Sequence, residues 1–358
     1  MSTPRTWRGG ERQVFSLIQE LEKQSLSQWL ICPVNSVLAQ RLEETDFDRT
    51  HQHPKKRGGI DPFFALNLKK LCVEKEIDIV HCHDSHAHTA AILAVVIYRL
   101  KVKIVVSRRV DFPISSSMVS QFKYNHRFVQ AIICVSDAIK EIVKSGVPQK
   151  STKVHTVYSG VNPEKYENLE EVDLRREFQI RPDKQVIVNV AALADHKDYP
   201  TFLKTISKLK NRDLYAVIFG DGELKTELEE LAGLLEISHK VKFAGFRTDV
   251  LPFLAKADCF LFPSKMEGLG TAVLDAFGCG VPVVTTRAGG ITEMVEHEQN
   301  GLLADVGDYE TLASHVEQVL DNQELRKRLT KNAKYTLSEF SVQHTASGTL
   351  KIYRNILS

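Results

Sequence analysis

Short apolar runs alternate with longer amphipathic segments along the whole chain. The runs are rich in Val and Ile and the longer segments show helical periodicity, a pattern typical of βαβ units around a parallel sheet that helices bury on both faces. In the first half we expect strands near 28–32, 77–81, 102–107, 131–135 and 153–157, and helices near 10–23, 61–75, 86–98, 118–129 and 136–145.

A second series begins after residues 159–169 (SGVNPEKYENL), which break the periodicity and predict a linker. The last amphipathic segment, near 342–356, predicts a helix that packs back on the first domain. The pattern therefore predicts two doubly wound, Rossmann-like α/β domains that face a cleft, one of residues 1–162 with helix 342–356 and one of residues 170–340. The strands expected in the second domain lie near 186–191, 214–219, 241–244, 258–262 and 281–285.

Composition agrees with two domains and excludes several classes of protein. The chain has 358 residues, 43% of them hydrophobic, which is enough for two cores and argues against disorder. Its 47 Lys and Arg against 45 Asp and Glu give a net charge of +2, so the electrostatic signature of a nucleic-acid binder is missing. The longest apolar run, 89–98, has half of the roughly 20 residues that a membrane span needs.

Targeting signals and cysteine spacing predict a cytoplasmic protein. Residues 1–8 lack the apolar core of a secretory signal, and the six cysteines form no CxxC pair, which indicates a reducing compartment. The stretch 51–57 (HQHPKKR) is either a solvated loop or a contact with an anionic membrane, so a peripheral position at the inner face of the membrane stays open.

The segment 258–290 reads strand, glycine loop, helix, strand and second glycine loop, and it has the physical features of a polyanion site. Gly268 and Gly270 would let the backbone approach a ligand closely. The amides of Leu269, Gly270 and Thr271 would open a helix whose dipole favours phosphate. The alternative is an ordinary glycine-rich turn between a strand and a helix.

Two acids flank this helix start. Glu267 precedes the helix and Asp275 lies eight positions later, inside it, so they would accept hydrogen bonds from separate groups of hydroxyls on one long ligand. In the alternative interpretation both are surface acids.

The segment resembles the E-x7-E region of the family-4 retaining glycosyltransferases of GT-B fold, with Glu267 as first acid and Asp275 in the second position. The phrases FGDGEL, FAGFRTDV, ADCFLFPS and GCGVPVVTT also agree with that family, and the similarity covers nearly the whole chain. The resemblance implies that Glu267 contacts the transferred sugar, that Asp275, one methylene shorter than Glu, holds the nucleotide ribose, and that the following amides face the diphosphate. It also places near the nucleotide Gly220, Phe246 and Arg247.

The loop VNVAALADHKD (188–198) resembles the family loop that carries an Arg and, five residues later, a Lys on the donor diphosphate. Lys197 matches the Lys, whereas Ala192 stands at the Arg position, so one of two expected cations is absent. Lys197 could otherwise be a solvated loop lysine.

In VVSRRVDFP (105–113), Arg109 takes the position of a family His that reaches the donor sugar. We hypothesise that Arg109 supplies, across the cleft, the charge missing at Ala192. The alternative is an Arg that pairs with Asp111 or Asp137.

The string IVHCHDSHAH (79–88) could suggest zinc, but its order does not match a known ligand run. It resembles instead the HxHD segment of family-4 and glycogen-synthase-like enzymes, which makes Asp84 a candidate sugar contact. Gly9 and Gly10 resemble the family's Gly-Gly loop beside donor phosphate and acceptor. A strand should precede that loop, but residues 1–6 are a poor central strand, so either the start codon is assigned too late or the first domain has lost its innermost strand.

The resemblance implies an enzyme that moves a hexose-like sugar from a nucleoside diphosphate sugar to a glycan or lipid-linked acceptor, with retention at the anomeric carbon and with neither metal nor cofactor. It also implies a place in cell-envelope polysaccharide biosynthesis. A nucleotide-sugar epimerase of the same fold, or a non-catalytic binding or scaffold protein with a degraded site, remain alternatives.

Overall fold

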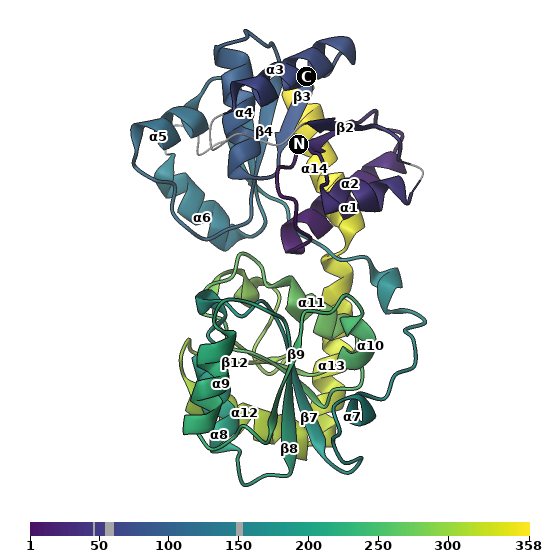
Figure 1. Ribbon diagram of the computed structural model, residues 1–358, viewed down its shortest axis with the longest axis vertical. Coiled ribbons are helices and arrows are strands. Elements are labelled where there is room, and N and C mark those ends of the chain that lie inside the picture. Colours follow the sequence, from purple (N-terminus) through teal and green to yellow (C-terminus); the bar gives the residue numbers. More distant parts are fainter. Residues whose placement is uncertain (46, 54–60, 148–152) are drawn as a thin grey trace. The chain divides into compact units, whose positions relative to one another are not determined.

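Each apolar run that the sequence places between helices forms a parallel strand in the computed structural model, which describes residues 1–45, 47–53, 61–147 and 153–358. The chain divides into a first unit of Met1–Gly160 with Val342–Ser358 and a second unit of Val161–Ser341 (Figure 1). The α/β class predicted from the sequence is confirmed.

The first unit contains a four-stranded parallel sheet in the order β3-β4-β5-β6 and a separate parallel pair β1-β2. Its strands are β1 (Leu30–Pro33), β2 (Thr50–His53), β3 (Ile79–Cys82), β4 (Lys103–Arg108), β5 (Val129–Cys134) and β6 (Val154–Thr156). Its helices are α1 (Gly9–Glu22), α2 (Val37–Glu43), α3 (Pro62–Glu74), α4 (Ser85–Val96), α5 (Met118–Asn125), α6 (Asp137–Gly146) and α14 (Val342–Leu357).

The structure agrees with the expectation that no strand precedes Gly9, but the first residues still take part in the backbone hydrogen bonding of this unit. Among the described residues no regular strand is assigned to 1–8, yet the first residues run between β1 and β3. Ser2 donates a backbone hydrogen bond to Ile31 (3.2 Å), and the Met1 carbonyl accepts one from His83 (3.0 Å). The Met1 amine donates to the carbonyl of His81 (2.8 Å). These bonds link the pair β1-β2 to the larger sheet, a role that the polar, proline-containing sequence of this segment concealed.

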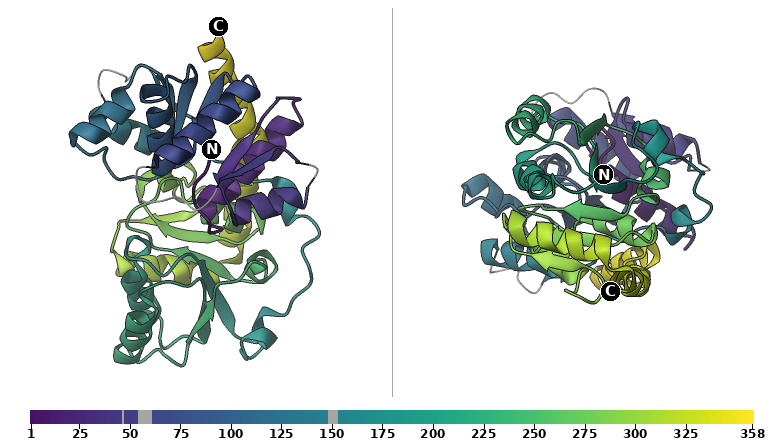
Figure 2. Two further views of the ribbon diagram at one scale, coloured as in Figure 1. Left: turned by 45° about the horizontal axis from the view of Figure 1, so that its top comes forward. Right: turned by 90° about the horizontal axis from the view of Figure 1, so that it is seen from below.

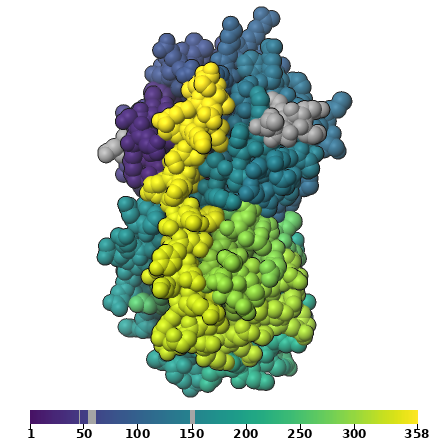
Figure 3. Space-filling view, turned by 180° about the vertical axis from the view of Figure 1, so that it is seen from behind, coloured from purple at the N-terminus to yellow at the C-terminus, as the bar shows by residue number. Residues whose placement is uncertain are grey.

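Helix α14 returns to the first unit and covers one face of its sheet (Figures 1 and 2). Ile352 packs with Val105 and Ile133 from β4 and β5, and Leu350 packs with Leu17 of α1. The outer side of α14 stays at the surface, as the space-filling view shows (Figure 3). The sequence prediction of a C-terminal helix on the first domain agrees with this packing.

The second unit is built on a six-stranded parallel sheet in the order β12-β11-β10-β7-β8-β9. Its strands are β7 (Gln185–Val190), β8 (Leu214–Phe219), β9 (Val241–Gly245), β10 (Cys259–Phe262), β11 (Val283–Thr286) and β12 (Leu302–Ala304). Its α-helices are α7 (Leu174–Glu177), α8 (Tyr199–Lys208), α9 (Lys225–Leu234), α10 (Val250–Leu254), α11 (Thr271–Gly278), α12 (Tyr309–Asp321) and α13 (Gln323–Glu339), and its 3-10 helices are η2 (Pro163–Tyr166), η3 (Asp195–Lys197) and η4 (Gly289–Glu293).

This strand order creates a topological switch point. From β7 the chain first adds β8 and β9 on one side and then returns to add β10, β11 and β12 on the other, so β7 and β10 are neighbours with opposite onward directions. Ligands of doubly wound sheets bind at the carboxyl ends of such a strand pair. The fold therefore points to the loops after β7 and β10.

Where expectation and structure differ, the reasons are local. The helix expected over 118–129 ends at Asn125 because Val129 starts β5, and β2 was not expected because its THQH sequence is polar. Of the basic stretch 51–57, His51–His53 belong to β2 and 54–57 lie outside the described residues. No helix in the described part of the chain is long and apolar enough to cross a membrane.

Candidate active site

The loops after β7 and β10 meet through Lys197 and Glu267. The Lys197 ammonium forms an ion pair with Glu267 Oε1, and the Ser264 hydroxyl donates to the same oxygen (2.8 Å). The amide of Lys265 donates to the carbonyl of His196 (2.9 Å), which joins the two loop backbones. Two residues that are 70 positions apart are thus held together at the switch point.

A third loop fixes Glu267 from behind. The amide of Gly290 donates to the Glu267 carbonyl (3.1 Å). At Gly289, where φ is +49°, a Cβ atom would lie 2.1 Å from that carbonyl oxygen, so only glycine fits. Glu267 is 8% exposed, and its backbone and carboxylate are both held before any ligand arrives.

The amino terminus of α11 lies beside this pair and has the features expected of an anion site. Gly270 precedes Thr271 in the left-handed conformation (φ 88°, ψ 49°), and no side chain caps the helix. The first N–H groups of α11 and the positive end of its dipole are therefore available to a phosphate. Gly268 and the buried Leu269 belong to the loop that leads into this turn.

Asp275, in the second turn of α11, is already engaged. Its Oδ1 accepts from the Lys165 ammonium (2.6 Å) and from the Tyr166 hydroxyl (2.8 Å), both from η2. The Tyr166 ring covers Gly278, where a Cβ atom would lie 2.3 Å from it. The segment that follows the first unit is thus docked on the helix that carries the second acid.

Three further predicted nucleotide residues lie at the carboxyl ends of β8 and β9. Gly220 (φ +159°) lets the loops after β7 and β8 touch, because a Cβ there would lie 1.8 Å from the Ala191 carbonyl oxygen. Phe246 is 64% exposed. Arg247 donates to carboxylates of Asp249 (2.7 Å) and Glu177 (2.6 Å), which raise the pKa of its guanidinium. Phe246 can stack on a base, whereas Arg247 braces the loop.

In the first unit, Asp84 acts as a structural cap. Its side chain accepts from the amides of His86 and Ala87 (both 2.9 Å) at the start of α4. It also accepts from Thr3, through the amide (2.7 Å) and the hydroxyl (2.6 Å). The two bonds from Thr3 tie the first residues of the chain to the loop after β3, and the two from His86 and Ala87 cap α4.

Arg109 forms its hydrogen bonds inside the first unit, with Gln13 and His83. These are not Asp111 and Asp137, the partners that the alternative interpretation predicts. Its Nε donates to Gln13 Oε1 (2.7 Å), and its Nη1 donates to the His83 carbonyl (2.9 Å). Its Nη2 lies 3.0 Å from His83 Nδ1, which must accept this bond because a guanidinium has donors only. The predicted reach of Arg109 to the donor stays a prediction.

The other predicted features of this unit have structural partners. Both ring nitrogens of His81 are used, by the Tyr353 hydroxyl (2.5 Å) and the Ser107 hydroxyl (2.8 Å), and burial places the pKa of His81 well below its usual value. No cluster of three or more metal-ligating side chains occurs within the described ranges. Gly9 and Gly10 form the first turn of α1, and a Cβ at either would meet no atom within 4 Å.

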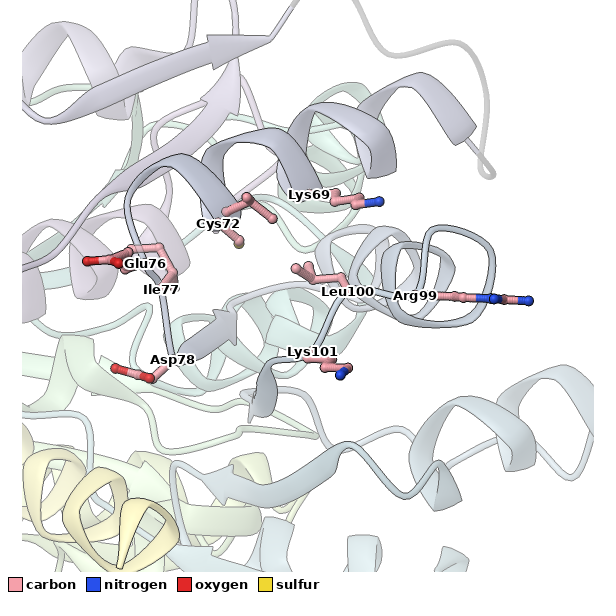
Figure 4. Close-up of a pocket in the computed structure, with 9 residues that line it drawn as sticks. Lys69, Cys72, Glu76, Ile77, Asp78, Arg99, Leu100 and Lys101 are labelled. Atoms are coloured by element: carbon pink, nitrogen blue, oxygen red, sulfur yellow. The ribbon is translucent and has the colours of Figure 1, made fainter.

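The first unit also contains a pocket of about 410 Å³, which is separate from the predicted site residues. It is lined by residues of α3 and of the loops that lead into β3 and β4, so it belongs to the amino edge of the sheet (Figure 4). Cys72 lies on its α3 wall, and burial raises the pKa of this thiol to about 12. None of the predicted site residues lines this pocket.

Comparisons with known proteins now decide the family. Residues 171–336 match the family model described as glycosyl transferases group 1, and residues 7–165 match glycosyltransferase family 4. An uncharacterized glycosyltransferase of Methanocaldococcus jannaschii is 30% identical over 311 residues, which are 82% of this chain and 80% of that protein. The chain belongs to the family-4 glycosyltransferases.

Two further similarities place this family-4 glycosyltransferase among its relatives. A lipopolysaccharide core biosynthesis glycosyltransferase of Rhizobium meliloti is 30% identical over 248 residues, covering 69% of this chain and 68% of the relative. The crystal structure of Anabaena HepE in complex with UDP shares the fold with a TM-score of 0.83 at 19% identity, over 99% of this chain and 98% of that one. The predicted GT-B fold is thereby confirmed.

The candidate site also contains residues that the sequence did not single out. Ser264 and Gly289 support Glu267, and Lys165 and Tyr166 engage Asp275. Gly289 had a local signal, since it stands in a Gly-Gly pair in the loop that follows a predicted strand, four residues after the end of that strand. The pair Lys165–Tyr166 had none, because it lies in the presumed linker, 109 residues or more from its partner.

Proposed function

We propose that this family-4 glycosyltransferase moves a hexose-like sugar from a nucleoside diphosphate sugar to a glycan or lipid-linked acceptor, with retention at the anomeric carbon. The observation that carries the proposal is the switch-point arrangement of the second unit: Lys197, Glu267 and the uncapped amino terminus of α11 converge there. A cation and an array of N–H groups beside a buried carboxylate suit a ligand that joins a phosphate to a hydroxyl-rich sugar.

In the proposed mechanism, Lys197 and the amides of the turn 269–271 bind the diphosphate, and Glu267 accepts a hydrogen bond from a sugar hydroxyl. The bond between the anomeric carbon and the phosphate oxygen breaks, and its electron pair goes to that oxygen. The acceptor oxygen bonds the same carbon from the same face, and its proton passes to the departing phosphate. The proposed reaction needs no metal because the cationic side chain and the helix terminus stabilise the leaving charge.

Two observations support a glycan or lipid-linked acceptor: exposed apolar side chains of the first unit and the name of one relative. Large apolar side chains are exposed after β4 and on α5, among them Phe112 (57%), Met118 (89%) and Phe122 (53%). An exposed apolar segment of this kind fits a lipid-carried acceptor. The similarity to a lipopolysaccharide core enzyme supports an acceptor of the cell envelope.

A panel of UDP-, GDP- and ADP-sugars followed by NMR tests the donor chemistry. We expect slow hydrolysis of one donor class without acceptor and a product of retained anomeric configuration with acceptor. Epimerisation of a donor without acceptor would instead establish an epimerase, and binding without turnover would establish a non-catalytic protein. Failure of every donor to bind would refute the proposal.

A further inference from the structure

The donor site is short of one positive charge. Ala192, which is exposed in the loop after β7, stands where the family pattern has an arginine. The charge of Lys197 is already balanced by Glu267. The neighbouring Lys265 is paired with Asp195 (3.1 Å) and lies 3.8 Å from Asp198. A diphosphate would therefore meet little uncompensated positive charge from these loops.

Lys165 brings a cation to the same helix from a different direction. Its Nζ lies 2.6 Å from Asp275 Oδ1, and its side chain is 25% exposed, so it remains accessible to a ligand. Asn162 caps the 3-10 helix that carries Lys165 by accepting from the Glu164 amide (3.0 Å). Tyr166, packed over Gly278, fixes the same segment. Lys165 is thus positioned by the fold.

The helix geometry sets how far Lys165 is from the anion site. Asp275 lies four residues after Thr271, and an α-helix rises about 1.5 Å per residue, which gives roughly 6 Å along the axis. The ammonium bound to Asp275 therefore lies about one helical turn from the N–H groups that open α11. That distance is shorter than the screening length of about 8 Å at physiological ionic strength.

We propose that Lys165 is a donor-binding residue, and that its ammonium supplies to the nucleoside diphosphate the positive charge that Ala192 does not provide. This inference rests on the proposed function, because it names a further residue of the same donor site. The inference also explains why Asp275 stands at the second acid position: its carboxylate holds the Lys165 ammonium beside the phosphates. Asp275 would then bind the ribose together with a cation rather than as an isolated carboxylate.

The test compares ligands of increasing charge. UDP, ADP and GDP are titrated into the full-length protein by calorimetry, and the base that binds is then studied as nucleoside, monophosphate and diphosphate. For Lys165→Met we expect about a tenfold loss of diphosphate affinity, a smaller loss for the monophosphate and none for the nucleoside. The affinity for the diphosphate should also depend less on salt than in the unaltered protein.

Two variants serve as controls. Lys208→Met removes a lysine of the same unit that pairs with Glu310 at the same 2.6 Å but lies on α8, and it should bind all ligands as the unaltered protein does. Adding Ala192→Arg to Lys165→Met places a cation back at the family position and should restore the diphosphate affinity. Thermal unfolding confirms that each variant is folded.

The outcomes separate this inference from the proposed function. Equal losses for nucleoside and diphosphate in Lys165→Met would show that Lys165 only holds Asp275 in place, and unchanged affinities would show that it has no role; either result overturns the inference and leaves the proposed function standing. If the unaltered protein binds none of the three diphosphates, the proposed function fails and the inference fails with it. Should Lys165→Met prove unfolded, Lys165→Gln takes its place in the same series.

Discussion

Replacing Lys197 by Met tests the centre of the proposed mechanism, because it removes the cation that would face the leaving phosphate. An ammonium about 4 Å from a phosphate oxygen contributes about 4 kcal/mol at an effective dielectric constant of about 20. The ion pair with Glu267 cancels part of this charge. If half remains, about 2 kcal/mol of transition-state stabilisation is lost, which corresponds to a fall in kcat of roughly 30-fold.

Lys197→Met is also expected to lower the free energy of unfolding, and this loss has to be separated from the fall in kcat. Glu267 is 8% exposed and would lose its cation while keeping the Ser264 hydroxyl. Breaking a buried pair in this way costs about 3–5 kcal/mol of the free energy of unfolding. We therefore introduce Lys197→Met into the Glu267→Gln background, where no uncompensated carboxylate remains, and take the ratio of the two kcat values. Because the carboxylate that cancels part of the Lys197 charge is absent there, the full contribution of about 4 kcal/mol is lost, and we expect kcat to fall roughly 900-fold.

The assay measures initial rates of nucleoside diphosphate release at saturating donor, with the melting temperature of each variant recorded alongside. Lys265→Met is the matched control, since Lys265 lies two residues before Glu267 but is 39% exposed and pairs with Asp195. It should change kcat by less than about twofold. A double variant with the same kcat as Glu267→Gln alone would refute the role given to Lys197.

Three further predictions address the first unit. Asp84→Ala should lower the free energy of unfolding by about 2 kcal/mol, because the caps of α4 and the bonds from Thr3 are lost, and urea titration measures it; a purely catalytic Asp84 would leave that free energy unchanged. The double variant Met118→Ser, Phe122→Ser should reduce transfer to a lipid-linked acceptor while donor hydrolysis persists, and equal rates with both acceptor types would contradict the proposed lipid contact. Burial lowers the pKa of His88 to about 3, so the unfolded chain binds more protons below about pH 6.5 and stability falls on acidification by up to about 1.4 kcal/mol per pH unit. His88→Leu should flatten this dependence in urea unfolding between about pH 7.5 and pH 5, and an unchanged slope would show that His88 is not responsible.

The helices and strands, and most of the motif loops of the second unit, can be predicted from the local amino-acid sequence. Strands such as 186–191 and 214–219 were predicted to within a residue or two, because period and β-branched content are local properties. Lys197 and Glu267 were named from their loops, and the fold then placed them at the switch point, where parallel strands end at one edge.

The partner of each charged side chain, by contrast, depends on how the folded chain packs. Lys165 meets Asp275 across 110 positions, Thr3 meets Asp84 across 81, and Arg109 meets Gln13 across 96. Such pairs leave no periodic trace, because they depend on how segments far apart in the chain are packed beside one another. The same reason explains the first residues, whose polar sequence predicts no strand and whose backbone nevertheless bonds to β1 and β3, since sheet pairing needs only backbone groups and space between two strands.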